Sequence, residues 1–319
     1  MKFYFAPMEG VTDHTFRNIH HKYFPGLDRY FTPFLSPTQD GRFTGKKVKD
    51  VRPEENRGVN VVPQLLTKRP EDFLWAAREL ADLGYREVNL NLGCPSGTVV
   101  AKGKGSGMLA DPEGLERFFD EIFARTPVAV SVKTRLGMRG EAEFPRLLEI
   151  FNRYPIAELT VHVRVREDFY RLPARLDAFT LPLAQSKAPV CYNGDLTTEA
   201  NFSAFQSRFP DTPAAMLGRG LVADPALVRR IQGGPSADRE TLKQYHDELY
   251  ESYCVAFQSE RNALCRMKEI WFYHICLFEG SEKIEKKLRK TTDPGEYRAL
   301  AARIFGELPL RAEGALPKW

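Results

Sequence analysis

Polar and charged residues follow most of the short apolar runs in the first 235 residues of this 319-residue chain. Gln64 lies in the third run, Asn91 and Cys94 close the fourth, Lys133 lies in the fifth and His162 closes the sixth. A lysine can stabilise negative charge, and a thiol that is neutral near pH 7 can supply a proton. A single strand-end amide is usually a capping residue, but so many polar residues at run ends predict one shared reaction site.

The last two runs end in glycine-containing segments, Asn193-Gly194-Asp195 and Gly218-Arg219-Gly220. Glycines let backbone N–H groups approach an anion, and an arginine offers it a forked contact. Together with Lys133 and the amide of Gln64, these segments fit flavin mononucleotide (FMN), which carries a phosphate and a ring that becomes electron-rich on reduction. Sugar phosphates use similar loops, so the residues alone leave both ligands open.

The elements that must position these residues are strands, because eight short apolar runs alternate with helical stretches. The predicted strands cover residues 3–6, 30–35, 61–66, 87–92, 128–134, 158–163, 190–193 and 214–218. Eight parallel strands close a (β/α)8 TIM barrel, whose active site lies at the carboxyl ends of the strands. No G-x-G-x-x-G follows a strand, which argues against a Rossmann dinucleotide site.

Helix starts and one composition break complete the expected organisation. Thr12 and Asp13 offer caps, and Asp111-Pro112 opens a helix with a device that Asp224-Pro225 repeats. A Gly/Pro/Ser break at residues 233–236 is followed by helical periodicity alone. We therefore predict an α/β fold. The first predicted domain is an FMN-binding TIM barrel over residues 1–235. The second is a small C-terminal helical domain over residues 236–319, with helices expected in 239–278 and 295–305.

The composition is that of a globular protein, with 43% hydrophobic and 28% charged residues. Lys plus Arg number 46 and Asp plus Glu 42, an excess of +4 that permits an RNA partner without demanding one. No window approaches the roughly 18 apolar residues of a membrane helix, and no secretory signal is evident, so we expect a cytoplasmic protein that does not engage a membrane.

Five cysteines, an odd number, do not form a disulfide framework. Cys254, Cys265 and Cys276 are spaced eleven residues apart, so one long helix would place them along one face. At about 1.5 Å per residue they would lie roughly 16 Å apart, too far to share a metal. We expect three buried apolar side chains and no metal site.

Several motifs resemble those of the tRNA-dihydrouridine synthase family. In chain order they are Ala6-Pro7-Met8-Glu9-Gly10-Val11-Thr12-Asp13, Asn91-Leu92-Gly93-Cys94-Pro95, Val132-Lys133-Thr134-Arg135, Asn193-Gly194-Asp195 and Gly218-Arg219-Gly220. Their order and spacing match from the first strand to the eighth. The tail, with Arg266-Met267-Lys268-Glu269 and Trp271-Phe272-Tyr273, is similar to that family's RNA-binding domain.

The resemblance implies an FMN enzyme that reduces the C5–C6 double bond of uridines in RNA, most often tRNA, with NADPH as electron donor and no stable protein partner. It assigns Cys94 as proton donor and Asn91 as the neighbour that helps to fix the uracil. The implied flavin residues are Pro7, Met8 and Glu9 along the flavin, Gln64 and Lys133 on the ring, His162 near it, and Asn193, Gly194, Asp195, Gly218 and Arg219 on the ribityl phosphate side.

Two departures from the family pattern bear on the substrate. Thr32-Pro33-Phe34 stands where the family usually shows Thr-Glu-Met, and His162-Val163-Arg164-Val165 where it shows His-x-Arg-Thr. The first lies on the substrate side, so the target could be another tRNA position or ribosomal RNA. The rival predictions are an FMN barrel that reduces a free pyrimidine or an enone, which needs no basic aromatic tail, and a non-catalytic RNA-binding factor, which needs no Cys94.

Basic residues near the expected mouth and in the tail are candidates for RNA backbone contacts. They are Arg42, Lys46, Lys47 and Lys49, then Lys102 and Lys104, and in the tail Lys283, Lys286, Lys287, Arg289 and Lys290. Most such runs are simply solvated faces. The Gly-rich loop at residues 102–107 follows Cys94 closely and is either a mobile lid or a plain loop.

Overall fold

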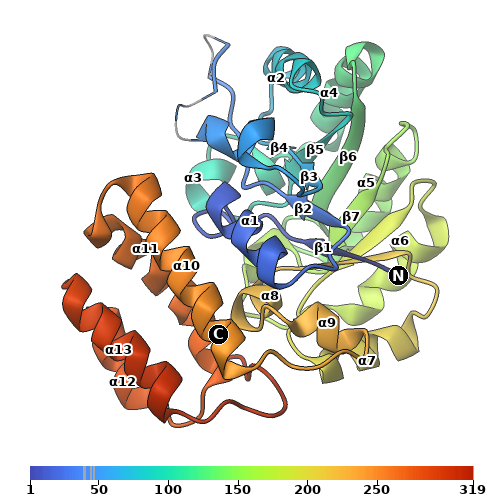
Figure 1. Ribbon diagram of the computed structural model, residues 1–319. Coiled ribbons are helices and arrows are strands. Elements are labelled where there is room, and N and C mark those ends of the chain that lie inside the picture. Colours follow the sequence, from blue (N-terminus) through green and yellow to red (C-terminus); the bar gives the residue numbers. More distant parts are fainter. Residues whose placement is uncertain (39–40, 44, 46, 319) are drawn as a thin grey trace. The chain divides into compact units, whose positions relative to one another are not determined.

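The computed structural model describes residues 1–38, 41–43, 45 and 47–318 (Figure 1). They form two compact units. The first unit comprises Met1–Pro7, Asp28–Asp195 and Arg208–Met216, and the second comprises Met8–Leu27, Leu196–Ser207 and Leu217–Trp319. The domain boundary expected after residue 235 stays a prediction.

A parallel sheet of nine segments forms the centre of the fold. The segments are β1 (Lys2–Phe5), β2 (Arg29–Phe31), β3 (Val61–Val62), β4 (Gln64–Leu65), β5 (Glu87–Leu92), β6 (Ala129–Arg135), β7 (Leu159–His162), β8 (Val190–Asn193) and β9 (Ala214–Leu217). Their order is β3-β2-β1-β9-β8-β7-β6-β5-β4. Since only Pro63 separates β3 from β4, the two ends of the sheet are halves of one strand, interrupted by a residue without an N–H donor. The sheet therefore returns to its start with eight strand positions, which confirms the predicted (β/α)8 class.

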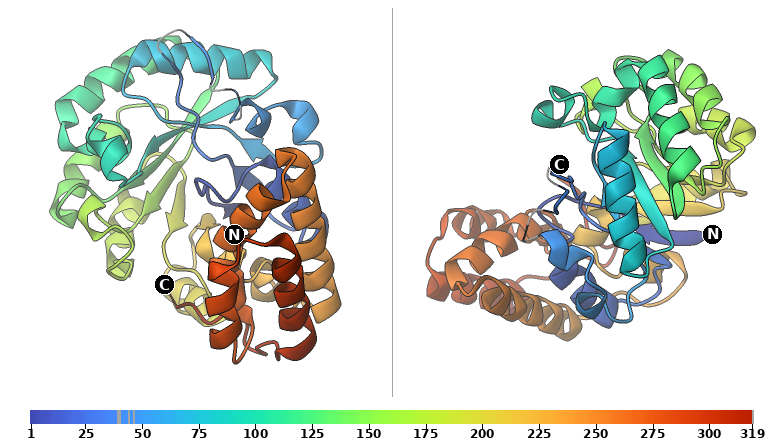
Figure 2. Two further views of the ribbon diagram at one scale, coloured as in Figure 1. Left: turned by 90° about the vertical axis from the view of Figure 1, so that its left-hand side faces the viewer. Right: turned by 90° about the horizontal axis from the view of Figure 1, so that it is seen from above.

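Helices cover the outer side of these strands (Figure 2). In the first unit they are α2 (Pro70–Asp82), α3 (Gly97–Val100), α4 (Pro112–Arg125), α5 (Phe144–Phe151) and α6 (Thr180–Gln185), with short 3₁₀ turns between them such as η3 (Gly105–Ala110). The predicted start of α4 is confirmed, because Asp111 accepts a hydrogen bond from the Gly114 N–H at 3.0 Å and Pro112 follows it.

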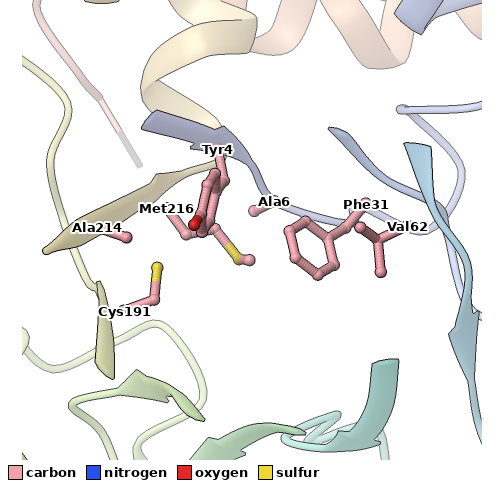
Figure 3. Close-up of a cluster of buried hydrophobic side chains, with 7 residues drawn as sticks. All are labelled: Tyr4, Ala6, Phe31, Val62, Cys191, Ala214 and Met216. Atoms are coloured by element: carbon pink, nitrogen blue, oxygen red, sulfur yellow. The ribbon is translucent and has the colours of Figure 1, made fainter. Parts of the chain in front are cut away.

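Side chains fill the interior of the barrel (Figure 3). One buried cluster consists of Tyr4, Ala6, Phe31, Val62, Cys191, Ala214 and Met216. Tyr4 and Ala6 share a direction because residues two apart on a strand face the same side, and so do Ala214 and Met216. The Tyr4 hydroxyl donates to Glu158 at 2.8 Å, which satisfies a polar atom inside the core. The interior is thus a packed core, as in other TIM barrels.

The second unit is helical. It contains α1 (His14–Tyr23), most of α7 (Glu199–Arg208), α8 (Arg219–Ala223), α9 (Leu227–Ile231), α10 (Arg239–Phe257), α11 (Glu260–His274), the turn η7 (Ile275–Leu277), α12 (Glu282–Lys290) and α13 (Pro294–Glu307). The long helical stretch predicted over residues 239–278 is broken: Gln258 takes a left-handed φ of 50° and Ser259 caps α11. Helix α12 was not expected, since only Ile284 and Leu288 of its nine residues are buried.

Within this unit, helix α1 packs against α10, and its capping residue Asp13 also binds a residue of α11. Asp13 caps α1 through the Phe16 N–H at 3.1 Å, as predicted. The same carboxylate accepts from the Tyr253 hydroxyl at 2.9 Å and pairs with Arg266 at 2.9 Å. The expected cap at Asp224 instead holds a turn, with its carboxylate accepting from the Ala226 N–H, and α9 begins only at Leu227.

The cysteine prediction was wrong in part. Cys276 is buried in η7, but Cys254 is half-buried on α10 and Cys265 is exposed on α11. The break at residues 258–259 places Cys254 on α10 and Cys265 on α11, so the three thiols do not lie along one long helix. Within the described part of the chain, no helix is long and apolar enough to cross a membrane.

Three buried histidines make the stability of the second unit depend on pH. Burial lowers the pKa of His20 to about 3 and of His274 to about 4, and it also lowers the pKa of His246. Because these values lie below the ordinary 6.5, the unfolded chain binds more protons as pH falls below about 6.5, and stability is lost progressively toward pH 4. At pH 5 each of His20 and His274 would cost about 2 kcal/mol relative to pH 7.5.

We expect the thermal unfolding midpoint to fall steadily between pH 7 and pH 4.5. His20 packs between Phe16 and Phe24 at ring-centroid distances of 6.0 and 5.8 Å, so His20→Phe removes the titrating group and keeps an aromatic ring. This variant should show a flatter pH dependence than the parent. Parallel curves for the two proteins would contradict the assignment.

Candidate active site

Lys133 lies on β6 in a half-buried position near the carboxyl ends of the strands. Its Nζ donates to Asn193 Oδ1 at 2.8 Å, and Asn193 Nδ2 donates in turn to the Met216 carbonyl at 2.8 Å. Burial, together with the positive charge of the neighbouring Arg135, lowers the pKa of Lys133 to about 7. Lys133 forms no ion pair with any of the described residues, so the hydrogen-bond partner of its ammonium group is the neutral amide of Asn193. Such a lysine favours an anionic or electron-rich ligand.

A chain of amides crosses three neighbouring strands. Asn89 donates to Ser131 at 3.0 Å, Gln64 donates to Asn89 at 2.8 Å, and Asn91 donates to Gln64 at 2.7 Å. The oxygen of Asn91 then accepts from the N–H groups of Gly93 and Cys94 at 3.0 and 2.9 Å. The chain therefore ends on the backbone that carries the Cys94 thiol. Asn91 is also the register partner of Lys133 on the next strand.

The loop of half-buried Cys94 is held by two further contacts. Arg135 Nε donates to the Gly93 carbonyl at 2.9 Å, and the Ser106 hydroxyl donates to the Cys94 carbonyl at 2.8 Å. The Gly-rich segment at residues 102–107, predicted to be a lid or a plain loop, differs in exposure along its length. Lys102 is exposed, whereas Gly105 and Ser106 are buried.

His162 and Asp195 meet through an arginine that the sequence reasoning left without a role. Arg164 lies 3.0 Å from His162 Nε2 and binds the Asp195 carboxylate with both terminal nitrogens, at 2.9 and 2.5 Å. Asp195 also accepts from the Ala174 N–H at 3.0 Å. The Asp195 carboxylate therefore already accepts hydrogen bonds from other residues of the protein. An anion bound at this loop would accept hydrogen bonds from backbone N–H groups. A Cβ at Gly194 would lie 3.0 Å from the Tyr192 hydroxyl, so packing favours a glycine there.

The sequence did not indicate the contact between Arg135 and Tyr170. Arg135 is fully buried, donates to the carbonyls of Val165 and Phe169 at 3.0 and 2.9 Å, and lies 5.1 Å from the ring centroid of Tyr170. Tyr170 is 52% exposed, and its ring centroid also lies 5.9 Å from that of His162. Arg135 shares the face of Lys133 two residues earlier, a signal present in the sequence. Tyr170 follows β7 in an irregular segment, where no periodicity could mark it.

The predicted cofactor residues fall in both units. In the first are Pro7, Gln64, Lys133, His162, Asn193, Gly194 and Asp195, together with Asn91 and Cys94. Met8, Glu9, Gly218 and Arg219 belong to the second. There Met8 anchors a turn through Thr12 Oγ1 at 2.9 Å, and Arg219 begins α8.

The first departure from the family pattern, at residues 32–34, has its own contacts. Thr32 Oγ1 accepts from the Gln64 N–H at 3.0 Å. Lys47 donates to the Phe34 carbonyl at 3.1 Å and lies 4.6 Å from its ring centroid, so this candidate RNA contact is partly engaged already. Arg42 and Lys49 are exposed, and Lys46 lies outside the described residues.

A parallel barrel with a buried lysine, an amide chain and a held thiol at its strand ends defines an α/β-barrel protein with an active site of the TIM-barrel kind. The fold is shared with a histamine dehydrogenase from Rhizobium sp. 4-9, with a TM-score of 0.54 and 14% identity over 73% of this chain and 45% of that one. It is also shared with an old yellow enzyme homologue from Zymomonas mobilis, with a TM-score of 0.51 and 14% identity over 75% of this chain and 91% of that one.

Residues 4–301 match the dihydrouridine synthase family, and the chain belongs to it. It is 32% identical to a tRNA-dihydrouridine(16) synthase from Cupriavidus necator over 75% of this chain and 77% of the relative. It is 28% identical to tRNA-dihydrouridine synthase B from Pasteurella multocida over 92% and 90%, and 26% identical to probable tRNA-dihydrouridine synthase 2 from Bacillus subtilis over 93% and 92%. The protein is therefore an oxidoreductase, and the predicted family is confirmed.

Proposed function

We propose that this protein is an FMN-dependent tRNA-dihydrouridine synthase of the cytoplasm that reduces the C5–C6 double bond of uridines with electrons from NADPH. The observation that carries the proposal is the register of β5 and β6, which makes Asn91 the partner of Lys133 while Asn91 holds the Cys94 N–H at 2.9 Å. The proposed proton donor, in the loop that follows β5, thus lies near the half-buried cation on the neighbouring strand β6. The names of the three relatives support tRNA as the substrate.

The residues present fit FMN. Lys133, half-buried and without a carboxylate partner among the described residues, suits a ring that gains negative charge on reduction. The proposed binding residues are Gln64, Lys133 and His162 at the ring, Asn193, Gly194 and Asp195 by backbone or amide groups, and Pro7, Met8, Glu9, Gly218 and Arg219 as the family resemblance implies. The chemistry that FMN supplies when bound is hydride delivery to C6 of the uracil.

The protein's own residues supply the proton and the geometry. Addition across C5–C6 consumes one hydride at C6 and one proton at C5, and the Cys94 thiol provides that proton and becomes a thiolate. Asn91 keeps the Cys94 backbone in place through the amide chain that ends at Ser131. A uridine stacked in folded RNA must be flipped out to reach this site.

The lysines of α12 offer the second unit a surface for the RNA backbone. Lys283, Lys286, Lys287 and Lys290 follow one another at i, i+3, i+4 and i+7, so they share one exposed face. None of the four forms an ion pair with a described residue. The acids of the same helix, Glu282 and Glu285, face Lys318 at 3.5 and 3.9 Å. Four unpaired positive charges on one face suit a row of phosphates.

Replacing these four lysines by glutamine should weaken tRNA binding by about tenfold or more at 0.1 M salt, because each lost phosphate contact also lowers the slope of log affinity against log salt by about 0.7–0.9. Flavin content should not change. Arg303→Gln is the matched control, since Arg303 on α13 already pairs with Glu307 at 2.9 Å. Equal loss in the control, or none in the quadruple variant, would assign RNA binding to another surface.

A map of dihydrouridine in tRNA and ribosomal RNA, from cells lacking the gene and from their parent, tests the proposal directly. Loss at defined tRNA positions is the expected result. Loss in ribosomal RNA alone would move the substrate to that RNA. If neither map changes, even after removal of related genes, the activity is that of an FMN barrel acting on a small pyrimidine or enone.

A further inference from the structure

The segment that follows Cys94 returns to it and forms its support. Ser106 donates to the Cys94 carbonyl through its hydroxyl at 2.8 Å and through its N–H at 3.2 Å. Both Gly105 and Ser106 are buried, at the start of η3. The Cys94 backbone is therefore held at its N–H by Asn91 and at its carbonyl by Ser106. The thiol projects from a peptide that is bound on both sides.

Gly105 lies against Cys94 so closely that no side chain fits between them. A Cβ at Gly105 would lie 3.0 Å from Cys94 Cβ, 3.0 Å from Val99 Cγ1 and 3.1 Å from the Cys94 carbonyl oxygen. Gly105 also takes a left-handed φ of 58°. Two separate requirements, backbone conformation and contact with Cys94, thus meet at this residue.

We infer that Gly105 and Ser106 are positioning residues that set where the Cys94 thiol stands. The inference rests on the proposed function for its catalytic meaning. It explains why a glycine-rich segment follows the cysteine at this distance: a glycine at residue 105 leaves the space beside Cys94 Cβ that a side chain would crowd, and Ser106 fixes the adjoining carbonyl. Gly105 and Ser106, the buried residues of the segment 102–107, thus hold the Cys94 backbone that carries the thiol.

Gly103 provides a matched control for the test. It lies in the same segment and takes a similar left-handed φ of 66°, but a Cβ there would meet only the flexible end of the Lys68 side chain, at 3.3 Å. Gly103→Ala and Gly105→Ala therefore carry the same kind of backbone strain, and only the second pushes on Cys94. Ser106→Ala is a milder change, because the Ser106 N–H still donates to the Cys94 carbonyl.

The first measurement is product formation in the FMN-loaded enzyme. Gly105→Ala should lower kcat for dihydrouridine formation by about tenfold or more with KM for tRNA unchanged, because displacement of a reacting group by less than 1 Å is enough for such a loss. Gly103→Ala should stay within about threefold of the parent, and Ser106→Ala should fall between the two. Flavin content and NADPH oxidation should be the same in all variants.

The second measurement needs neither flavin nor RNA. Iodoacetamide alkylation is followed by peptide mapping, with the exposed Cys265 as internal reference. The ratio of Cys94 to Cys265 rates should change at least threefold in Gly105→Ala and remain unchanged in Gly103→Ala. Equal ratios in the two glycine variants would overturn the inference. If the parent forms no dihydrouridine in RNA, the proposed function fails while the alkylation ratio still decides whether Gly105 positions the thiol.

Discussion

Cys94→Ala should lower dihydrouridine formation in tRNA by at least about a hundredfold, the usual worth of a positioned general acid. The alanine keeps the Cβ, so the contacts of the Cys94 N–H with Asn91 and of its carbonyl with Ser106 are retained. The bound flavin and its reduction by NADPH should stay near the parental level, because neither requires a proton at uracil C5. Single-turnover formation of dihydrouridine from reduced enzyme measures the affected step alone.

Cys265→Ala is the control for this experiment, since Cys265 is exposed on α11 in the second unit. It should leave every readout unchanged. Turnover of Cys94→Ala at the parental rate would remove Cys94 from the mechanism and pass the role of proton donor to water or to another group. Joint loss of flavin and activity would show that the alanine disturbs the barrel instead.

Lys133→Gln should leave the purified protein with less than about a tenth of the parental flavin, because a buried charge–ligand contact is commonly worth more than 1.4 kcal/mol, or tenfold in affinity. Glutamine can still donate a hydrogen bond to Asn193, so the core is preserved while the charge is removed. Absorbance near 450 nm per chain reports the flavin. Lys102→Gln, at an exposed position in the first unit, is the control and should keep its flavin.

The contribution of Lys133 to flavin affinity should decrease as pH rises. With a pKa of about 7 in the ligand-free protein, Lys133 is charged below pH 7 and loses its proton above it. The ratio of parental to Lys133→Gln affinity should therefore be largest below pH 7 and should fall as pH rises to 8.5. The flavin phosphate titrates in both proteins, so it cancels in the ratio. A ratio that does not change with pH would mean that the charge of Lys133 does not contribute to binding.

The strands of the barrel could be predicted because their apolar runs are long enough to be read locally. Residues 87–92 and 190–193 coincide with β5 and β8, and the others agree within a few residues at their ends. The helical part was predicted less well. Helix α12 was not predicted because only two of its nine residues are buried, which leaves almost no apolar periodicity. The break at Gln258 was not predicted because it depends on a left-handed φ, a conformation that a glutamine in the sequence does not indicate.

The chemical types at the site could also be predicted, whereas their partners could not. Cys94, Asn91 and Lys133 stood out because each follows or ends an apolar run. Arg164 binds Asp195, 31 residues further along the chain, and Arg135 lies against the ring of Tyr170, so both contacts join segments far apart in the chain. Such pairs follow from register and loop packing, which no local pattern contains.

By itself, then, the sequence determined the class of fold, the family and the residue types that meet at the strand ends. Those properties follow from hydrophobic period and motif spacing, which act over a few residues at a time. Only the tertiary structure decided that Gly105 lies close to Cys94, that Lys133 is without a carboxylate partner among the described residues, and that α1 packs against α10. The reason is physical: burial and contact depend on chain segments that approach one another only after folding, and burial is what lowers the pKa of Lys133.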